Sequence, residues 1–295
     1  MKQPIDAAGI RELTDKAFKI RADLLKFSTR INMSHLGGEL SIIDMATALY
    51  YRYLNYDFSN PAWEDRDRFI LSKGHCSEVL YMICADKGVY TVDYIVDHFE
   101  CLDKSQFGQH SNRKYVPYIE VSAGSLGHGL PIAVGYALGA RKKEQNYRIF
   151  VLTGDGELDE GTNWEAMMAA AHYQLGNLTL IIDKNGMSMT GLTKDVMNID
   201  PLDEKLKAFG FNVVECDGND MESVCRTIEA LPEPDYTVRR APTAIIMHTT
   251  KGFGVDFMEN NNKWHGGALA IEQLEEALDS LDRKRAQIAE ERGER

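Results

Sequence analysis

The chain has 295 residues, of which 44% are hydrophobic and 26% charged, and these proportions are ordinary for a globular protein with a sizeable core. Its net charge of −12 argues against a nucleic-acid-binding protein. An anionic ligand would need positive charge that is concentrated locally at its binding site. No apolar run approaches the ~18 residues needed to span a bilayer, and the first residues lack a signal-peptide core. The five cysteines include no Cys-x-x-Cys pair, which predicts reduced, buried thiols and hence a cytoplasmic protein.

Helical patterns dominate the first part of the chain. Apolar residues recur at helical spacing in residues 10–29 and 41–54. Residues 60–120 are rich in loops and contain one expected helix near residues 76–87. Residues 125–144 then predict a helix of small residues that is entered through a glycine-rich turn and packs tightly on its neighbours.

Buried strands alternate with helices in the second half of the chain. The expected strands cover residues 148–153, 178–183, 211–217 and 243–249, and the expected helices between them cover residues 163–176, 203–210 and 221–231. Such alternation of Val- and Ile-rich strands with amphipathic helices is typical of an α/β fold, a parallel sheet flanked by helices on both faces. We therefore expect one domain over residues 1–295, with an N-terminal helical segment and a charged C-terminal helix from Ala270.

Two oxygen-bearing side chains follow neighbouring strands of this predicted sheet. Asp155 comes after the strand 148–153 between Gly154 and Gly156, and Asn185 comes after the strand 178–183. Parallel strands place their carboxyl ends at one edge of the sheet, where open α/β folds bind ligands. A carboxylate and an amide there suit a hard cation such as Mg²⁺, which keeps phosphate oxygens and water as further ligands. The turn at Asp155 or the turn at Asn185, taken alone, is more often only a tight turn. The occurrence of both turns after two buried strands favours a metal and phosphate site.

The stretch Gly154–Gly186 resembles the thiamine diphosphate fingerprint, and in particular that of transketolase. Family members often end this fingerprint in Asn-Asn or Asp-Asn, whereas here Lys184 precedes Asn185. The resemblance implies thiamine diphosphate as cofactor, with Asp155, Asn185 and the carbonyl of Met187 holding Mg²⁺ or another divalent cation such as Ca²⁺ or Mn²⁺. It also implies that Gly154 and Gly156 lie at the diphosphate and Met189 against the thiazolium ring.

Further segments resemble transketolase motifs along most of the chain. They are "NMSHLGGELS", "SKGHCSEVLY", "FGQHSN", "GSLGHGLPIAVG" and "HTTKGFGVDFMENNNKWHG". By resemblance, the expected catalytic or substrate-contacting histidines are His35, His110 and His265, and the expected cofactor-binding residues in these segments are His75, Gly124, Leu126, Lys251 and His265. A lone histidine is more often structural, but four of the eight histidines match histidine positions of these motifs. Because a diphosphate needs local cations in an acidic protein, we expect positive charge from His75, Lys251 and His265.

The resemblance covers only one of the two modules that a thiamine diphosphate enzyme needs. The second module holds the aminopyrimidine and supplies an activating glutamate. We therefore expect the N-terminal subunit of a split transketolase, active with a pyrimidine-module subunit, in an α2β2 assembly. Glu160 matches the family position at the subunit contact, although an acid there could also simply stabilise a helix start. The expected reaction moves a two-carbon ketol unit from a ketose to an aldose, and the sequence leaves the sugars open.

Three other interpretations remain. One is another thiamine diphosphate enzyme, such as the alpha subunit of a 2-oxo acid dehydrogenase or a deoxyxylulose-phosphate-synthase-like protein. Another is a non-catalytic homologue, which would need neither Asp155 nor Asn185 nor the four histidines. The third reads "GSLGHG" as a dinucleotide-binding loop, but no acidic residue follows a second strand at the required distance.

Overall fold

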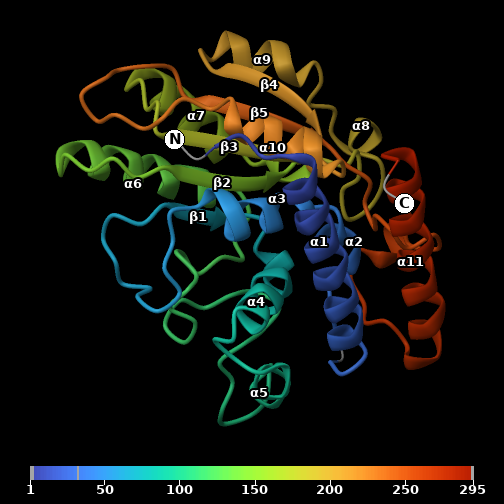
Figure 1. Ribbon diagram of the computed structural model, residues 1–295. Coiled ribbons are helices and arrows are strands. Elements are labelled where there is room, and N and C mark those ends of the chain that lie inside the picture. The colour runs from blue at the N-terminus through green and yellow to red at the C-terminus, as the bar shows by residue number, and fades with distance from the viewer. Residues whose placement is uncertain (1–2, 32, 294–295) are drawn as a thin grey trace.

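A five-stranded sheet runs through the middle of the computed structural model, which describes residues 3–31 and 33–293 (Figure 1). Its strands are β1 (Arg68–Leu71), β2 (Ile149–Gly154), β3 (Leu178–Lys184), β4 (Asn212–Asp217) and β5 (Thr243–His248), in the spatial order β1-β2-β3-β5-β4. All neighbouring strands pair in parallel, as expected from the sequence. The carboxyl ends of the strands therefore share one edge of the sheet.

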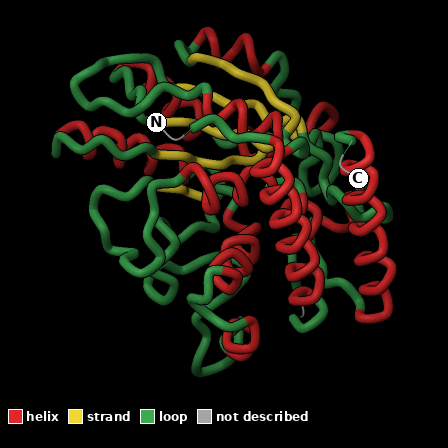
Figure 2. The backbone as a smooth tube through the Cα atoms, viewed as in Figure 1, coloured by secondary structure: helices red, strands yellow, loops and turns green. Residues whose placement is uncertain are grey.

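Helices cover both faces of the sheet (Figure 2). The helices are α1 (Ala7–Ser28), α2 (Leu36–Leu40), α3 (Ile43–Ala48), α4 (Ser77–Asp86), α5 (Val92–Asp97), α6 (Gly129–Lys142), α7 (Gly161–His172), α8 (Thr193–Val196), α9 (Leu202–Ala208), α10 (Met221–Glu229) and α11 (Leu274–Glu291). One face packs against α1, α3, α4 and α10, and the other against α6, α7 and α9.

The alternation of side chains along β2 shows how the sheet serves two cores. Phe150 and Leu152 belong to the core shared with α1, α3 and α4, whereas Ile149 and Val151 belong to the core shared with α6 and α7. All four side chains are fully buried. Because successive strand residues point to opposite faces, a strand covered on both faces must be apolar throughout. This explains the continuous apolar runs in the sequence.

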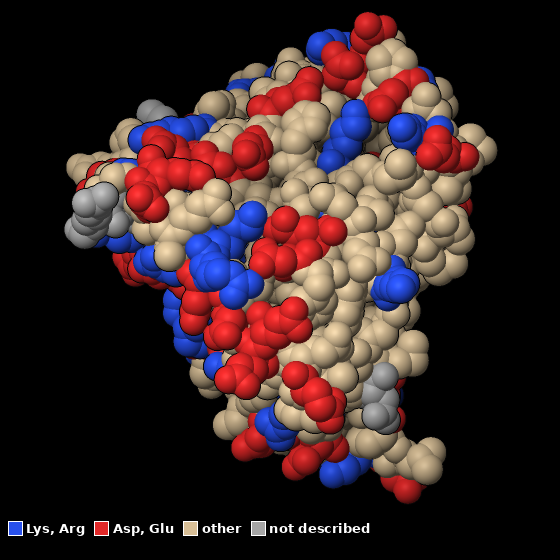
Figure 3. Space-filling model, turned by 90° about the vertical axis from the view of Figure 1, so that its right-hand side faces the viewer, with Lys and Arg blue, Asp and Glu red and all other residues tan. Residues whose placement is uncertain are grey.

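The C-terminal helix α11 lies alongside α1 (Figure 1). Its contacts combine buried apolar residues, such as Ala277 and Leu281, with ion pairs from Arg285 to Asp15 and from Arg292 to Asp220. Figure 3 looks at this side of the molecule and shows acidic and basic side chains intermixed next to a broad area without charged residues. The net negative charge of the chain is therefore not spread evenly over this side of the surface.

The structure departs from the sequence-based elements in the first third of the chain. Strand β1 and helix α5 both lie in the stretch 60–120 that reads as loop-rich. They have four and six residues, too few for a periodic pattern to stand out. The helix expected over residues 41–54 begins as α3 and continues as a π-type turn at Leu49–Tyr53.

Two other features bear on the class of protein. Within the described ranges, no helix is long and apolar enough to cross a membrane. All five cysteines are free thiols, and four of them are buried while Cys101 is half-buried.

Candidate active site at the carboxyl edge of the sheet

A cavity of about 410 Å³ opens at the carboxyl ends of the strands, between the segments that follow β1, β2, β3 and β5. It collects sequence-predicted site residues that lie far apart in the chain: His35, His75, His110, Gly124, Leu126, Gly154, Asp155, Gly156, Asn185, Met187, Met189, Lys251 and His265. Glu160 is the one predicted site residue that does not line it. The cavity thus brings together all of the expected site residues except Glu160.

The carboxylate of Asp155 bridges two glycine-containing turns. Its Oδ1 accepts a hydrogen bond from the backbone N–H of Gly156 at 2.9 Å, and its Oδ2 accepts one from the N–H of Gly186 at 2.8 Å. The side chain is 2% exposed, and burial, followed by the nearby charge of Asp183, raises its pKa to about 6. A bound cation would reverse this effect, because a positive charge favours the ionised carboxylate.

Asn185 has both ends of its side-chain amide fixed. Its Nδ2 donates to Oδ2 of Asp183 at 3.0 Å, and its Oδ1 accepts from the backbone N–H of Met187 at 3.0 Å. Asp155 also contacts this turn through Gly186. A carboxylate oxygen, an amide oxygen and the Met187 backbone thus meet at one turn beside the cavity.

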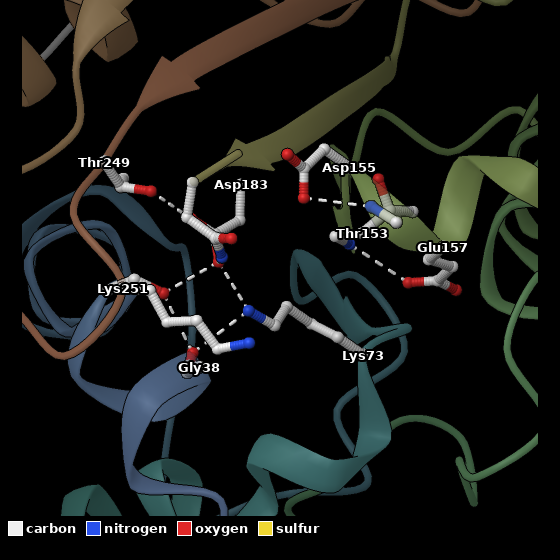
Figure 4. A network of polar contacts seen from close by, with 12 residues as sticks. Gly38, Lys73, Thr153, Asp155, Glu157, Asp183, Thr249 and Lys251 are labelled. Atoms are coloured by element: carbon white, nitrogen blue, oxygen red, sulfur yellow. Dashed lines mark hydrogen bonds and ion pairs between the residues drawn. The ribbon is translucent and has the colours of Figure 1, made fainter. Parts of the chain in front are cut away.

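Asp183 and Lys73 form a buried ion pair under the cavity that the sequence analysis missed (Figure 4). The exposed fractions of the two side chains are 0% and 3%. Lys73 Nζ also donates to the carbonyl of Gly38 at 3.0 Å. Burial alone would lower the pKa of Lys73, but the charge of Asp183 raises it above the ordinary value. Lys73 lies shortly after β1, and Asp183 lies within β3. A charged residue in or next to an apolar strand is the sequence signal that could have identified them.

Glu157 is a second buried carboxylate that the sequence analysis missed (Figure 4). It accepts hydrogen bonds from the backbone N–H of Gly127 at 2.9 Å and of Gly154 at 3.1 Å, and a further one from the hydroxyl of Ser72. It therefore ties the turn after β2 to the turn before α6 and to the segment after β1. Because its carboxylate is fully engaged in this way, its role in the cavity wall is structural.

Four histidine rings surround one side of the cavity. The ring centroid of His35 lies 5.2 Å from that of His75, 5.8 Å from that of His265 and 6.3 Å from that of His110. Burial, followed by the charge of His110, lowers the pKa of His35 to about 4. Its Nδ1 is buried without a hydrogen-bond partner in the described chain. At neutral pH, His35 is thus an uncharged ring with an unsatisfied polar atom beside the cavity.

The charge distribution differs from the sequence-based expectation. Burial lowers the pKa of His265 to about 4 and that of His75 well below its usual value, so both rings are neutral in the ligand-free chain. Lys251 is 1% exposed, and burial lowers its pKa to about 8. Lys251 therefore supplies the positive charge that faces an anion, because the charge of Lys73 is paired with that of Asp183. The histidines offer hydrogen bonds.

Glycines keep one wall of the cavity open. Gly124 has a φ of +149°, and a Cβ there would lie 3.3 Å from the ring of His110. Gly74 leaves no room for a side chain either, since a Cβ would lie 2.5 Å from that of Ala123. Larger residues at these positions would displace the segments that carry His75 and His110.

Glu160 lies at the surface, away from the cavity. It is exposed, precedes the first residue of α7, and makes no side-chain capping hydrogen bond. Its Cβ and Cγ stack over Gly127, where an added Cβ would lie only 2.6 Å from the Cβ of Glu160. An exposed carboxylate beside the turn at Gly127 is in a position to contact a second chain.

The donor atoms beside the cavity fit a hard cation bound together with a phosphate. In residues 3–31 and 33–293, no group of three or more His, Cys, Asp or Glu side chains is arranged to hold a metal. A cation at Asp155 would therefore depend on the amide of Asn185, a backbone carbonyl and oxygens of the ligand itself. Such a set suits Mg²⁺, which prefers oxygen ligands and usually shares them with substrate phosphates.

Comparisons with known proteins find a family that matches most of the chain. The family described as "Transketolase, thiamine diphosphate binding domain" matches residues 15–289. The A chain of the apulose-4-phosphate transketolase of Actinobacillus succinogenes is 40% identical over 271 residues, which cover 92% of this chain and 96% of that one. The 6-deoxy-6-sulfo-D-fructose transketolase subunit SqwG of Clostridium sp. is 32% identical, and the match covers 93% and 98% of the two chains.

Solved structures show the same fold over nearly all of this chain. Transketolase from Leishmania mexicana superposes with a TM-score of 0.81 at 27% identity, over 94% of this chain and 41% of that one. Transketolase from Campylobacter jejuni gives a TM-score of 0.78 at 26% identity, over 96% and 48%. This chain thus spans less than half the length of these solved transketolases, but nearly the whole length of the two relatives named above.

Proposed function

The chain belongs to the transketolase family, and on that premise we propose that it is the diphosphate-binding subunit of a two-chain transketolase. The proposed reaction transfers a two-carbon ketol unit from a ketose donor to an aldose acceptor, which are sugars or sugar phosphates. It uses thiamine diphosphate with Mg²⁺ or a similar divalent cation. The observation that carries the proposal is the contact of the buried Asp155 carboxylate with the turn that carries Asn185, beside a cavity lined by four histidines.

In the proposed site, Asp155, Asn185 and the carbonyl of Met187 hold the cation. The cofactor, when bound, supplies the carbon that adds to the ketose carbonyl and stabilises the resulting negative charge. Lys251 and the neutral rings of His75 and His265 donate hydrogen bonds to the diphosphate, and Met189 packs against the cofactor rings. The glycine-walled side at Gly124 lets the cofactor approach closely.

His35 and His110 are the proposed substrate-facing groups. His35 is neutral at physiological pH because burial lowers its pKa to about 4. A neutral imidazole can accept a proton from a sugar hydroxyl or orient it by a hydrogen bond. The unsatisfied Nδ1 of His35 gives a site for such a hydrogen bond. These two rings therefore position hydroxyl groups and move protons in the proposed mechanism.

A second polypeptide completes the proposed active site. The rim of the cavity carries exposed apolar side chains after β3: Met189, Leu192, Val196 and Met197, which are 67%, 42%, 46% and 59% exposed. Such a patch is typical of a surface that another chain covers. Two relatives bear the name of one subunit of an apulose-4-phosphate transketolase, and the matches cover 96% and 95% of their lengths. Their names support the existence of a partner subunit. We propose that this partner carries the pyrimidine module and that the two chains form an α2β2 assembly. Glu160 is the residue that we propose to contact the partner's activating glutamate.

The five free thiols fit a reducing compartment, so we place the enzyme in the cytoplasm.

The experiment that tests the proposal compares the chain alone with the chain mixed with its pyrimidine-module partner. Both are assayed with a ketose donor, an aldose acceptor, Mg²⁺ and thiamine diphosphate. We expect turnover only in the mixture, and we expect Glu160→Gln to lower it without lowering the melting temperature of the chain. Glu165→Gln, also exposed on α7, is the matched control. Robust turnover by the chain alone would refute the two-chain assignment.

A further inference from the structure

Asp183 occupies the centre of the polar network under the cavity (Figure 4). It lies near the end of β3, where Gly154 of β2 and Met247 of β5 are its register partners, and its side chain is fully buried. Its carboxylate receives hydrogen bonds from four side chains, which come from the segments after α2, β1, β3 and β5: Ser41, Lys73, Asn185 and Thr249. These donors occupy both oxygens, so Asp183 has little capacity left to bind a cation itself.

Asp183 contacts both of the residues whose side chains are proposed as cation ligands, Asp155 through its backbone and Asn185 through its side chain. Its backbone carbonyl accepts a hydrogen bond from the N–H of Asp155 at 3.1 Å. Its Oδ2 accepts one from Nδ2 of Asn185 at 3.0 Å. Because Oδ2 of Asp183 accepts this hydrogen bond, the NH₂ group of Asn185 faces Asp183 and its oxygen faces the other way. The N–H of Met187 takes one lone pair of that oxygen, and a second lone pair remains for a cation.

Lys73 is the charged partner of Asp183, and the side chains of both residues are buried. A buried carboxylate needs such a paired and hydrogen-bonded partner to offset its lost hydration. The ammonium group of Lys73 is buried with it and donates to the same Oδ2. Its other contact, with the carbonyl of Gly38, fixes it between α2 and β3.

We propose that Asp183, buried in an ion pair with Lys73, is a positioning residue that fixes the side-chain amide of Asn185 with its oxygen toward the divalent cation. This role rests on the proposed function, because the cation belongs to it. Outer-shell partners that orient ligands in this way typically change metal affinity by ~10- to 100-fold when they are replaced.

The test uses a charge-balanced pair of substitutions. Asp183→Asn alone would leave the buried Lys73 unpaired and risks misfolding. Lys73→Met/Asp183→Asn removes both charges and lets residue 183 present either an oxygen or an NH₂ group to Asn185. Thr249→Val is the control, because it removes a hydrogen bond to the same carboxylate without touching Oδ2 or Asn185. The unaltered chain, the double variant and Thr249→Val, each mixed with the pyrimidine-module partner, are titrated with Mn²⁺ in the presence of thiamine diphosphate. Free Mn²⁺ is measured by electron paramagnetic resonance.

We expect the dissociation constant for Mn²⁺ to rise at least ~10-fold in the double variant and to change less than ~3-fold in Thr249→Val. The metal-free double variant should keep a cooperative thermal transition, and the spectrum of its bound Mn²⁺ should change because one ligand is misoriented. If the unaltered chain binds Mn²⁺ and the double variant binds it equally well, the positioning role is wrong while the cation site stands. If Thr249→Val weakens Mn²⁺ binding as much as the double variant does, the effect is structural and the role is also wrong. If the unaltered chain does not bind Mn²⁺, the cation site itself is refuted and the role with it.

Discussion

Lys251 Nζ donates a hydrogen bond to Nδ1 of His265 over 2.9 Å, and this contact fixes the tautomer of a ring that lines the cavity. With a pKa of about 8, Lys251 is mostly protonated at pH 7 and can act as the donor. An imidazole that accepts at Nδ1 carries its proton on Nε2. His265 therefore presents an N–H donor rather than a cation at the atom that is left free.

This relationship predicts the titration of His265. Burial and then the charge of Lys251 lower its pKa to about 4. In Lys251→Met, the pKa of His265 should rise toward, but stay below, the ordinary value of about 6.5, because burial persists. Nuclear magnetic resonance of the imidazole nitrogens measures both the pKa and the tautomer. A pKa and a tautomer of His265 that stay unchanged in Lys251→Met would show that Lys251 does not act on this ring.

A second prediction concerns the proposed cation ligands. Asp155→Asn or Asn185→Ala should lower the affinity of the assembled enzyme for thiamine diphosphate at least ~10-fold, about 1.4 kcal/mol, because each removes a ligand of the bridging cation. Asn is preferred to Ala at position 155, since the buried side chain accepts two backbone N–H groups. Calorimetric titration measures the effect. Asp159→Asn is the control, because it removes one negative charge from an exposed position, and it should leave the affinity for thiamine diphosphate unaltered. If neither Asp155→Asn nor Asn185→Ala changed this affinity, the two residues would not be cation ligands.

A third prediction separates the four histidines of the cavity. Replacing His35 or His110 with Ala should lower kcat/KM of the assembled enzyme by roughly 10²-fold or more, the range for positioned acid–base groups, while the cofactor still binds. Replacing His75 or His265 should instead weaken cofactor binding. Steady-state kinetics at varied cofactor concentration distinguish the two patterns. His172→Gln is the control outside the cavity, and identical behaviour of all four variants would contradict this division of roles.

A fourth prediction concerns two buried acids that the proposed mechanism does not use. Glu39 and Glu78 are fully buried, burial raises the pKa of both, and neither Glu78 oxygen has a hydrogen bond of ordinary geometry within the described chain. The folded chain therefore binds protons here more tightly than the unfolded chain, whose carboxyl groups titrate near about pH 4.3. The free energy of unfolding should thus fall as the pH rises from there toward the raised folded pKa values.

Glu78→Gln removes one of these groups and should flatten the loss of stability that begins as the pH rises above about 4.3. Denaturant unfolding of the metal-free chain at several pH values measures it. Glu165→Gln, an exposed change on α7, should leave the pH dependence as in the unaltered protein. Parallel curves for Glu78→Gln and the unaltered chain would show that the buried pair does not titrate in this range.

The amino-acid sequence by itself determined the parallel α/β sheet. The strand runs before Asp155 and Asn185 are mostly apolar because both faces of the sheet are covered, and such runs can be recognised locally. The motifs also indicated the members of the cavity, since each carries its histidine or glycine within a short distinctive segment. Strand β1 escaped notice because four residues between loops show no period.

Only the tertiary structure decided which groups carry charge and which hold others in place. The partner of Lys73 is Asp183, 110 positions further along the chain, and nothing in either local sequence announces this pairing. The neutrality of His75 and His265 likewise follows from burial beside lysines on other segments. Local patterns reflect contacts between near neighbours in the chain, whereas burial and ion pairing depend on segments that meet only when the sheet brings its strand ends to one edge.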